Sequence, residues 1–217
     1  MNTQLNIINH IHLYIDHLNS SIALTNKLAE YKEHLNEEEF KDLNKIQELN
    51  NLLFAVNTVT LDSLVILKNY STDAKETPYW ERLFFVKSSC LIMHEFFSYY
   101  YKNTNKIVEA IADDSTFSND YTNLTGNIKR FRKKYEKKLG QVRNLIAAHI
   151  NNDWKNNFYL ISTINNVEDG TMMLEFYELL TRIQALLIKL LLVIPSNELN
   201  LQELFLAKFD AFTDGPA

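Results

Sequence analysis

The sequence predicts an all-α protein, a helical bundle of four to five main helices with short peripheral helices. Apolar residues recur at 3.6-residue spacing in every long segment, which is typical of amphipathic helices. Only 4 Gly and 3 Pro occur in 217 residues, too few for a turn-rich β fold. Because no repeat or low-complexity linker divides the chain, we expect one domain over residues 1–217, with about the last ten residues loose.

The first half of the chain carries three helical patterns. A first amphipathic helix is expected over 3–32, and a second over 40–70, after a polar stretch. Pro78 suits the first turn of a third helix, which is expected to run to about Ala112. The third helix is rich in aromatic residues and apolar nearly all round, which indicates a central core helix. A platform on which nucleobases stack is the alternative.

The middle of the chain combines polar and basic segments. A polar, turn-like connection is expected over 113–125. Gly126 then precedes a basic helix that continues to Leu139. Gly140 allows a bend or a close backbone approach before the helical stretch 141–150.

Three further pieces are expected toward the C-terminus. A short helix is predicted over 154–164, and a strongly apolar last core helix over 171–194. Pro195 ends the core helix because proline cannot continue it. A short amphipathic piece is expected over 196–212.

Composition limits the function classes and the compartment. A net charge of −5 and an isoelectric point of about 5.7 exclude a generic nucleic-acid binder, so a polyanion site must be a local patch. The single Cys90 excludes an intramolecular disulfide and a zinc site of several cysteines, and its apolar surroundings predict a buried, inert thiol. No secretion signal opens the chain, and the longest apolar run, 185–194, is too short for a bilayer. We therefore expect a soluble cytoplasmic protein, not a membrane protein.

The histidines outside the basic region do not predict a metal site. His10 and His17 share a helix face, but His12 points elsewhere, and no acidic ligand repeats at helical spacing. We expect all three to be solvated on the polar face of the first helix, with no metal and no cofactor in the protein. His94 and Glu95 lie within the apolar third helix, and a satisfied, semi-buried core pair is favoured over a catalytic one.

The most basic part of this acidic chain lies in the predicted fourth helix. Seven of the ten residues from Lys129 to Lys138 are basic and one is acidic. A buried helical stripe is predicted at Ile128, Phe131, Tyr135 and Leu139. A merely solvated face is the alternative to an RNA-binding surface. The residues expected to contact the RNA backbone are Lys129, Arg130, Arg132, Lys133 and Lys134.

An arginine, an amide and a histidine follow the basic run. Arg143 is a fixed cation that suits phosphate oxygens, Asn144 comes next, and His149 can exchange a proton near neutral pH. Six positions turn an ideal helix by about 600° and advance it by roughly 9 Å, so Arg143 and His149 do not share a face. Joint action on one phosphate needs a distorted helix end, long converging side chains or two subunits. Alternatively, Arg143 pairs with a local carboxylate and His149 caps carbonyls.

This stretch resembles the R-polar-x4-6-H signature of the HEPN superfamily, and "NLIAAHI" is especially similar to its abortive-infection members. The resemblance implies an all-helical homodimer, a metal-independent RNase of a toxin or abortive-infection system, and a possible antitoxin partner. In such an RNase His149 acts as general acid or base, Arg143 stabilises charge on the phosphorane, and Asn144 positions them or the RNA. The alternative is a non-catalytic HEPN-like dimer that binds a protein or a nucleotide.

Overall fold

The structure is a computed structural model that describes residues 2–31, 37–71, 79–113, 115–148 and 166–193. These residues form five α-helices and one 3-10 turn, and no strand occurs among them. The predicted all-α bundle is therefore confirmed. The expected helices over 154–164 and 196–212, and the loose C-terminal end, lie outside the described residues.

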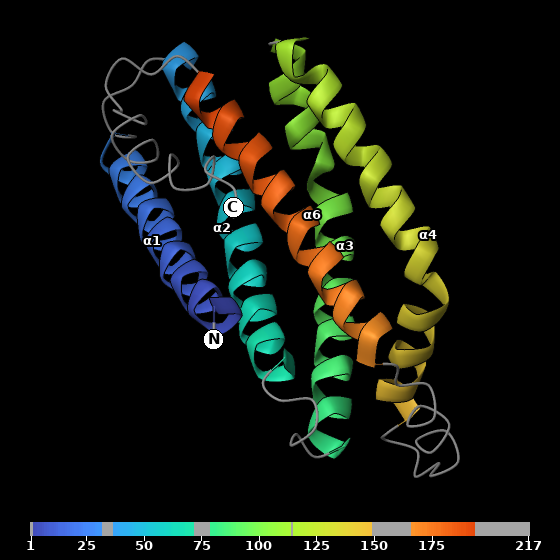
Figure 1. The fold of residues 1–217 in the computed structure, drawn as a ribbon. Helices are drawn as coiled ribbons and strands as arrows, with labels where there is room; N and C mark the ends of the chain where they lie inside the picture. Colours follow the sequence, from blue (N-terminus) through green and yellow to red (C-terminus); the bar gives the residue numbers. More distant parts are fainter. Residues whose placement is uncertain (1, 32–36, 72–78, 114, 149–165, 194–217) are drawn as a thin grey trace.

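The helices match four of the predicted segments within a few residues. In chain order the elements are α1 (Asn2–Tyr31), α2 (Glu37–Ser71), α3 (Tyr79–Asp113), η1 (Ser115–Phe117), α4 (Ser118–Ala148) and α6 (Asn166–Val193). Consecutive helices run in opposite directions (Figure 1).

The polar connection predicted over 113–125 is wrong. Asp113 is the last residue of α3, Ser115–Phe117 form a 3-10 turn, and residues 118–125 are the first two turns of α4. The helix forms because Leu124 and Ile128 are buried one turn apart, while the polar Thr125 and Asn127 between them are only partly buried. Gly126 lies inside α4, where a glycine costs a helix about 1 kcal/mol without ending it.

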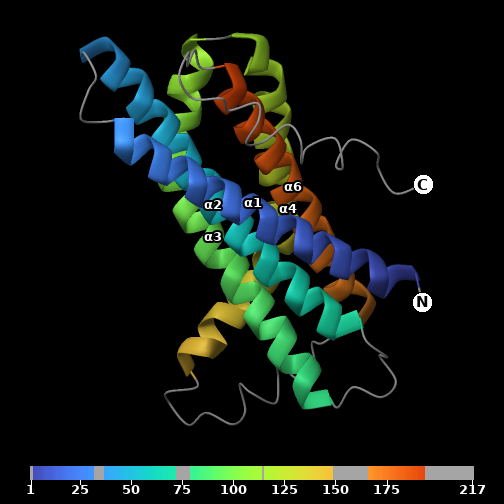
Figure 2. The ribbon, with the colours of Figure 1, turned by 90° about the vertical axis from the view of Figure 1, so that its left-hand side faces the viewer.

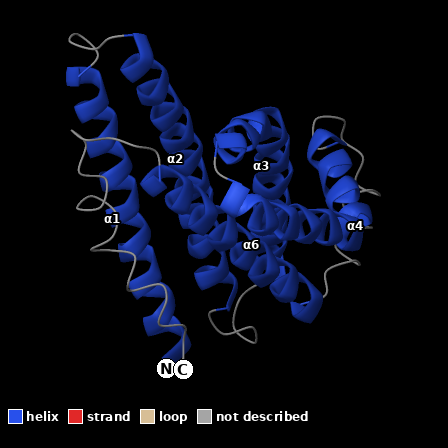
Figure 3. Ribbon diagram, turned by 90° about the horizontal axis from the view of Figure 1, so that it is seen from above, coloured by secondary structure: helices blue, strands red, loops and turns tan. Residues whose placement is uncertain are grey.

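Four helices make the bundle, and the fifth lies on its outside. Each of α2, α3, α4 and α6 packs against two neighbours in a closed ring, and α3 also reaches α6. α1 lies along the outer side of α2 (Figures 1 and 3). A view turned by 90° shows α1 crossing in front of the other helices (Figure 2).

Aromatic side chains fill the centre of the ring. Phe97 and Phe131 lie 5.8 Å apart between ring centroids, and Phe176 lies 5.8 Å from Phe97 and 5.9 Å from Phe131. This cluster joins α3, α4 and α6, so the prediction of a central core helix holds for this part of α3. At the start of α3, however, Trp80 and Phe84 are 67% and 63% exposed.

The expectation of three solvated histidines on α1 is wrong for two of them. His17 is fully buried, and His10 is half-buried with its Nδ1 2.6 Å from the hydroxyl of Tyr177. Burial lowers the pKa of His10. Only His12 is exposed. The difference arises because α1 contacts α6 as well as α2, so its polar side meets protein instead of water.

α2 is the one described helix that is long and apolar enough to cross a membrane, with mean hydropathy 1.4 over 18 residues of Leu43–Tyr70. A search for unbroken apolar runs overlooks it because asparagine and threonine interrupt the run. α2 packs against α1, α3 and α6, as a core helix does. Its buried Asn50 donates from Nδ2 to the carbonyl of Ser21, 2.9 Å away in α1.

Replacing Gly126 by alanine is expected to stabilise the protein. A Cβ atom at this position meets no atom within 4 Å outside its own helix backbone. Alanine in a helix interior is favoured over glycine by about 1 kcal/mol. For a chain of this size we expect a Tm increase of about 2–4 °C in thermal unfolding followed by circular dichroism. An unchanged or lower Tm contradicts a regular helix at Gly126.

Candidate nucleic-acid interface

The three residues of the predicted catalytic motif are only partly described. The backbone of Arg143 and Asn144 belongs to α4, which runs through Gly140 without interruption. Their side chains, and His149 as a whole, lie outside the described residues. The roles of Arg143, Asn144 and His149 therefore stay predictions. Figure 1 shows the axis of α4 changing direction toward its C-terminal end.

The buried stripe of α4 is confirmed. Ile128, Phe131, Tyr135, Leu139 and Val142 are all buried. These side chains point into the space between α3 and α6. The stripe divides the basic run, because the cations on one side of it meet α6 and those on the other side meet α3.

The side of α4 toward α6, here called the α6 flank, carries Arg130 and Lys134. Arg130 donates to Oδ1 of Asn127 at 2.6 Å, and Lys134 donates from Nζ to Oε1 of Glu175 at 2.5 Å. The hydroxyl of Tyr135 donates to the other oxygen of Glu175 at 3.1 Å. The hydrogen bond to Glu175 raises the pKa of Lys134. A carboxylate thus already compensates part of the charge on this flank.

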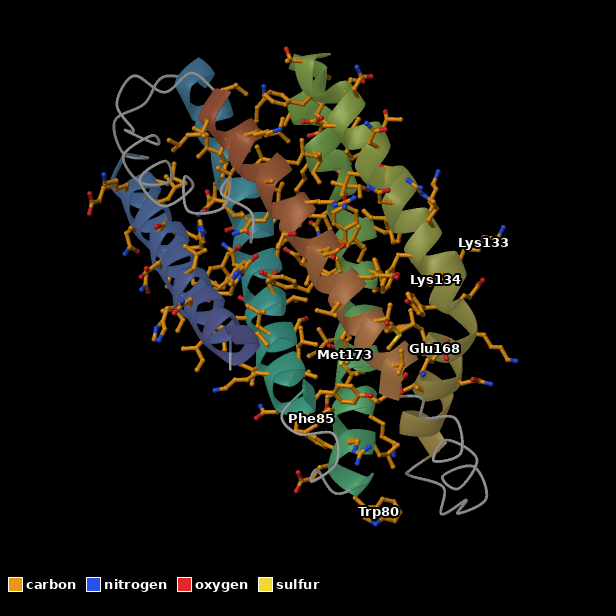
Figure 4. The ribbon with its side chains drawn as sticks, in the orientation of Figure 1. Trp80, Phe85, Lys133, Lys134, Glu168 and Met173 are labelled. Atoms are coloured by element: carbon orange, nitrogen blue, oxygen red, sulfur yellow. The ribbon has the colours of Figure 1, made fainter. Side chains whose placement is uncertain are left out.

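The side toward α3, here called the α3 flank, carries Arg132 and Lys133. The guanidinium carbon of Arg132 lies 4.9 Å from the ring centroid of Tyr101 and 5.8 Å from that of Phe97. Such cation–π contacts hold the cation without neutralising it. Lys133 projects outward from α4 (Figure 4). Lys129 is exposed, and no ion pair of Lys129, Arg132 or Lys133 with another described residue occurs within 4.0 Å.

A pocket of about 630 Å³, here called the α3 groove, lies between α3 and the α3 flank. Its lining residues are His94, Phe97, Ser98, Tyr101, Arg132, Lys133, Glu136, Leu139 and Gly140. The expected semi-buried pair of His94 and Glu95 is wrong for Glu95, which is exposed, whereas His94 is half-buried and lines this pocket. His94, Ser98 and Tyr101 recur at helical spacing on α3, a signal that sequence reasoning missed.

The last residue of the basic run is structural. Lys138 forms an ion pair with Asp169, whose side chain is fully buried at the start of α6. Burial lowers the pKa of Lys138, and the neighbouring charge of Glu168 opposes the shift. Cys90 is buried as predicted, and burial raises the pKa of its thiol to about 12. The thiol is therefore protonated at neutral pH and does not act as a nucleophile.

The chemistry of the interface is that of cations, a hydroxyl and aromatic rings. Within the described part of the chain, no group of three His, Cys, Asp or Glu side chains could hold a metal ion. Comparison of the chain with protein-family profiles, curated proteins and solved structures gives no match. The function is therefore argued from the residues of the site themselves.

Removing Lys138 is expected to destabilise the protein far more than removing the preceding lysine. Lys138→Ala breaks the ion pair with the fully buried carboxylate of Asp169, and breaking a buried ion pair costs about 3 kcal/mol or more. Lys137 is exposed, so Lys137→Ala serves as the matched control and should change stability by less than about 0.5 kcal/mol. Urea unfolding measures both. Equal stabilities of the two variants contradict a structural ion pair.

Proposed function

We propose that this protein is a metal-independent endoribonuclease of the HEPN type. It cleaves RNA by attack of the ribose 2′-hydroxyl, in the cytoplasm, within a toxin or abortive-infection defence system. One observation carries the proposal: an unbroken α4 joins Arg143 and Asn144 to the uncompensated cations of the α3 flank. A surface that attracts the RNA backbone thus leads directly to the residues proposed to cleave it.

The register of α4 supports this connection. Arg143 follows Arg132 by eleven residues, about three helical turns and a rise of roughly 16 Å. The two backbone positions therefore lie on the same side of the helix, with Gly140 between them. An RNA strand that binds along the α3 flank reaches the motif without crossing the buried stripe.

The proposed reaction needs one proton-transfer group and one cation. His149 takes the proton of the 2′-hydroxyl, whose oxygen forms a bond to phosphorus as the bond from phosphorus to the 5′-oxygen breaks. The leaving 5′-oxygen receives a proton from the imidazolium. Arg143 stabilises the negative charge that develops on the phosphorane oxygens, and Asn144 positions the arginine or the RNA. The products are a 2′,3′-cyclic phosphate and a 5′-hydroxyl.

A homodimer completes the proposed site. Arg143 and His149 are six positions apart and do not share a face of a regular helix. An isologous contact across a two-fold axis brings Arg143 of one subunit next to His149 of the other. The apolar residues exposed at the start of α3, Trp80 and Phe84, give the bundle additional surface for such a contact.

Loss of His149 or Arg143 is expected to abolish cleavage without changing the helical fold. Removing a general acid–base group typically lowers the rate about 10²–10⁴-fold, and losing the charge-stabilising cation has a comparable effect. His149→Ala and Arg143→Ala are assayed on labelled RNA in the presence of EDTA. A substrate with deoxyribose at the scissile position should resist cleavage. Full activity of His149→Ala, or strict dependence on a divalent metal, contradicts the mechanism.

Mixing the two inactive variants tests the composite site. If Arg143 of one subunit works with His149 of its partner, each heterodimer regains one intact site of its two. Half of the dimers are then heterodimers, so about a quarter of the wild-type activity returns. No recovery after verified subunit exchange contradicts a site shared between subunits.

Neutralising the α3 flank is expected to weaken RNA binding more than neutralising the α6 flank. For a single strand, the slope of log K against log salt concentration becomes shallower by about 0.7 for each cation–phosphate contact that is lost. The double variant Lys129→Gln/Lys133→Gln removes two exposed lysines, and Arg130→Gln/Lys134→Gln is the matched control on the flank held by Glu175. Binding of an uncleavable 2′-O-methyl RNA is measured between about 50 and 200 mM salt. Equal slopes of the two double variants contradict the assignment of the flanks.

A second candidate function is a non-catalytic HEPN-like dimer that binds nucleotides. The α3 groove favours it, because this pocket is formed by described residues that do not belong to the Arg–His motif. RNA binding without cleavage by the wild-type protein distinguishes this function from the endoribonuclease.

A further inference from the structure

Two pockets lined by described residues flank α4, and they differ in size and in whether their cations are paired. The pocket on the α6 flank measures about 230 Å³ and contains Arg130, Lys134 and Arg182 beside Glu175 and Glu178, with Lys134 paired to Glu175. The α3 groove measures about 630 Å³ and contains Arg132 and Lys133 against one carboxylate, Glu136. Each pocket therefore has one cation more than it has carboxylates, but the α3 groove is the larger of the two, and neither of its cations forms an ion pair with another described residue within 4.0 Å.

Arg132 is held in a way that leaves its hydrogen-bond donors available. Its guanidinium lies over the faces of Tyr101 and Phe97. A guanidinium donates its hydrogen bonds in its own plane, so stacking on a ring does not use them. No hydrogen bond or ion pair of Arg132 occurs among the described residues. The ring contacts thus restrict the position of the cation, which reduces the entropy lost when it binds a phosphate.

The wall formed by α3 supplies the other groups that a nucleotide requires. His94 and Ser98 line the groove one turn apart and offer an imidazole and a hydroxyl. Tyr101 is 39% exposed, enough to contact a base or a ribose. Glu136 accepts hydrogen bonds from a ribose hydroxyl or a base amino group. Two cations, an aromatic ring and neutral polar groups together match a phosphate attached to a sugar and a base.

We propose that the α3 groove binds one nucleotide unit, with the phosphate held by Arg132 and Lys133 and the base or ribose held against Tyr101. Its volume lies within the range of about 300–1,000 Å³ found for small-ligand pockets. The unit comes either from a free mononucleotide or from an RNA strand that continues along α4 toward Arg143. Only the RNA source rests on the proposed function, because binding in the groove requires neither His149 nor cleavage.

A substitution that fills the groove with an apolar side chain tests the proposal most directly, because it changes no charge. Gly140 lines the groove, and a Cβ added there meets no atom within 4 Å. Gly140→Leu therefore fills the pocket from the side of α4. Gly126→Leu is the matched control, since Gly126 lies in the same helix, has the same free space around its Cβ and lines neither pocket. Circular dichroism and Tm establish that both variants fold.

Binding is measured by fluorescence anisotropy with a labelled 2′-O-methyl hexanucleotide, which has no free 2′-hydroxyl and is not cleaved. Gly140→Leu is expected to weaken binding at least tenfold, whereas Gly126→Leu should bind like the wild type. Tyr101→Ala should lose about tenfold, within the range for one base–aromatic stack. If Gly140→Leu does not fold, Tyr101→Ala and Ser98→Ala, which replace exposed side chains, test the proposal alone.

Competition with unlabelled AMP and CMP identifies the source of the nucleotide. Displacement of the probe by either mononucleotide supports a site for free nucleotides, and resistance to both supports a strand site. Equal binding by the Gly140→Leu and Gly126→Leu variants overturns the proposal, as does full binding by Tyr101→Ala. Absence of any binding by the wild-type protein overturns it too. Because the probe is uncleavable, a failure of the endoribonuclease mechanism leaves the outcome of this measurement unchanged.

Discussion

The packing of Phe131 against Phe97 and Phe176 determines how the rest of α4 is used. These three rings lie within 5.9 Å of one another between centroids and join α3, α4 and α6. Once Phe131 points into the bundle, helical periodicity fixes the direction of every neighbouring residue. Arg130 and Lys134 must lie toward α6, and Arg132 toward α3. A hydrophobic contact in the core thus decides which cations remain available at the surface.

The same constraint explains why a run of seven basic residues does not act as one uniform surface. Lys138 is paired with the buried Asp169, and Lys134 is paired with Glu175. On the α3 flank no described carboxylate forms an ion pair with Arg132 or Lys133, and aromatic rings meet Arg132 instead. In an acidic protein with a net charge of −5, such a local excess is what a polyanion can recognise.

Sequence reasoning succeeded where one helix alone contains the information. The buried stripe of α4 follows from the spacing of Ile128, Phe131, Tyr135 and Leu139, and the structure confirms it. It failed where a second helix decides, as at His17, which is buried because α1 packs against the bundle. The α3 groove belongs to this second class. His94 and Arg132 are 38 residues apart in sequence, and no local pattern shows that they line one pocket.

Gly140 lines the α3 groove and lies three residues before Arg143 in α4. It is a poor helix former, yet α4 continues through it, so its value to the protein does not lie in helix propensity. With no side chain, it leaves open the part of the α3 groove nearest to Arg143. A larger residue here would stabilise the helix and narrow the pocket at the same time. A glycine at this position is therefore better explained by a requirement for space between α3 and α4 than by the needs of the helix, and this space is where a strand bound by Arg132 would pass on its way to the Arg–His motif.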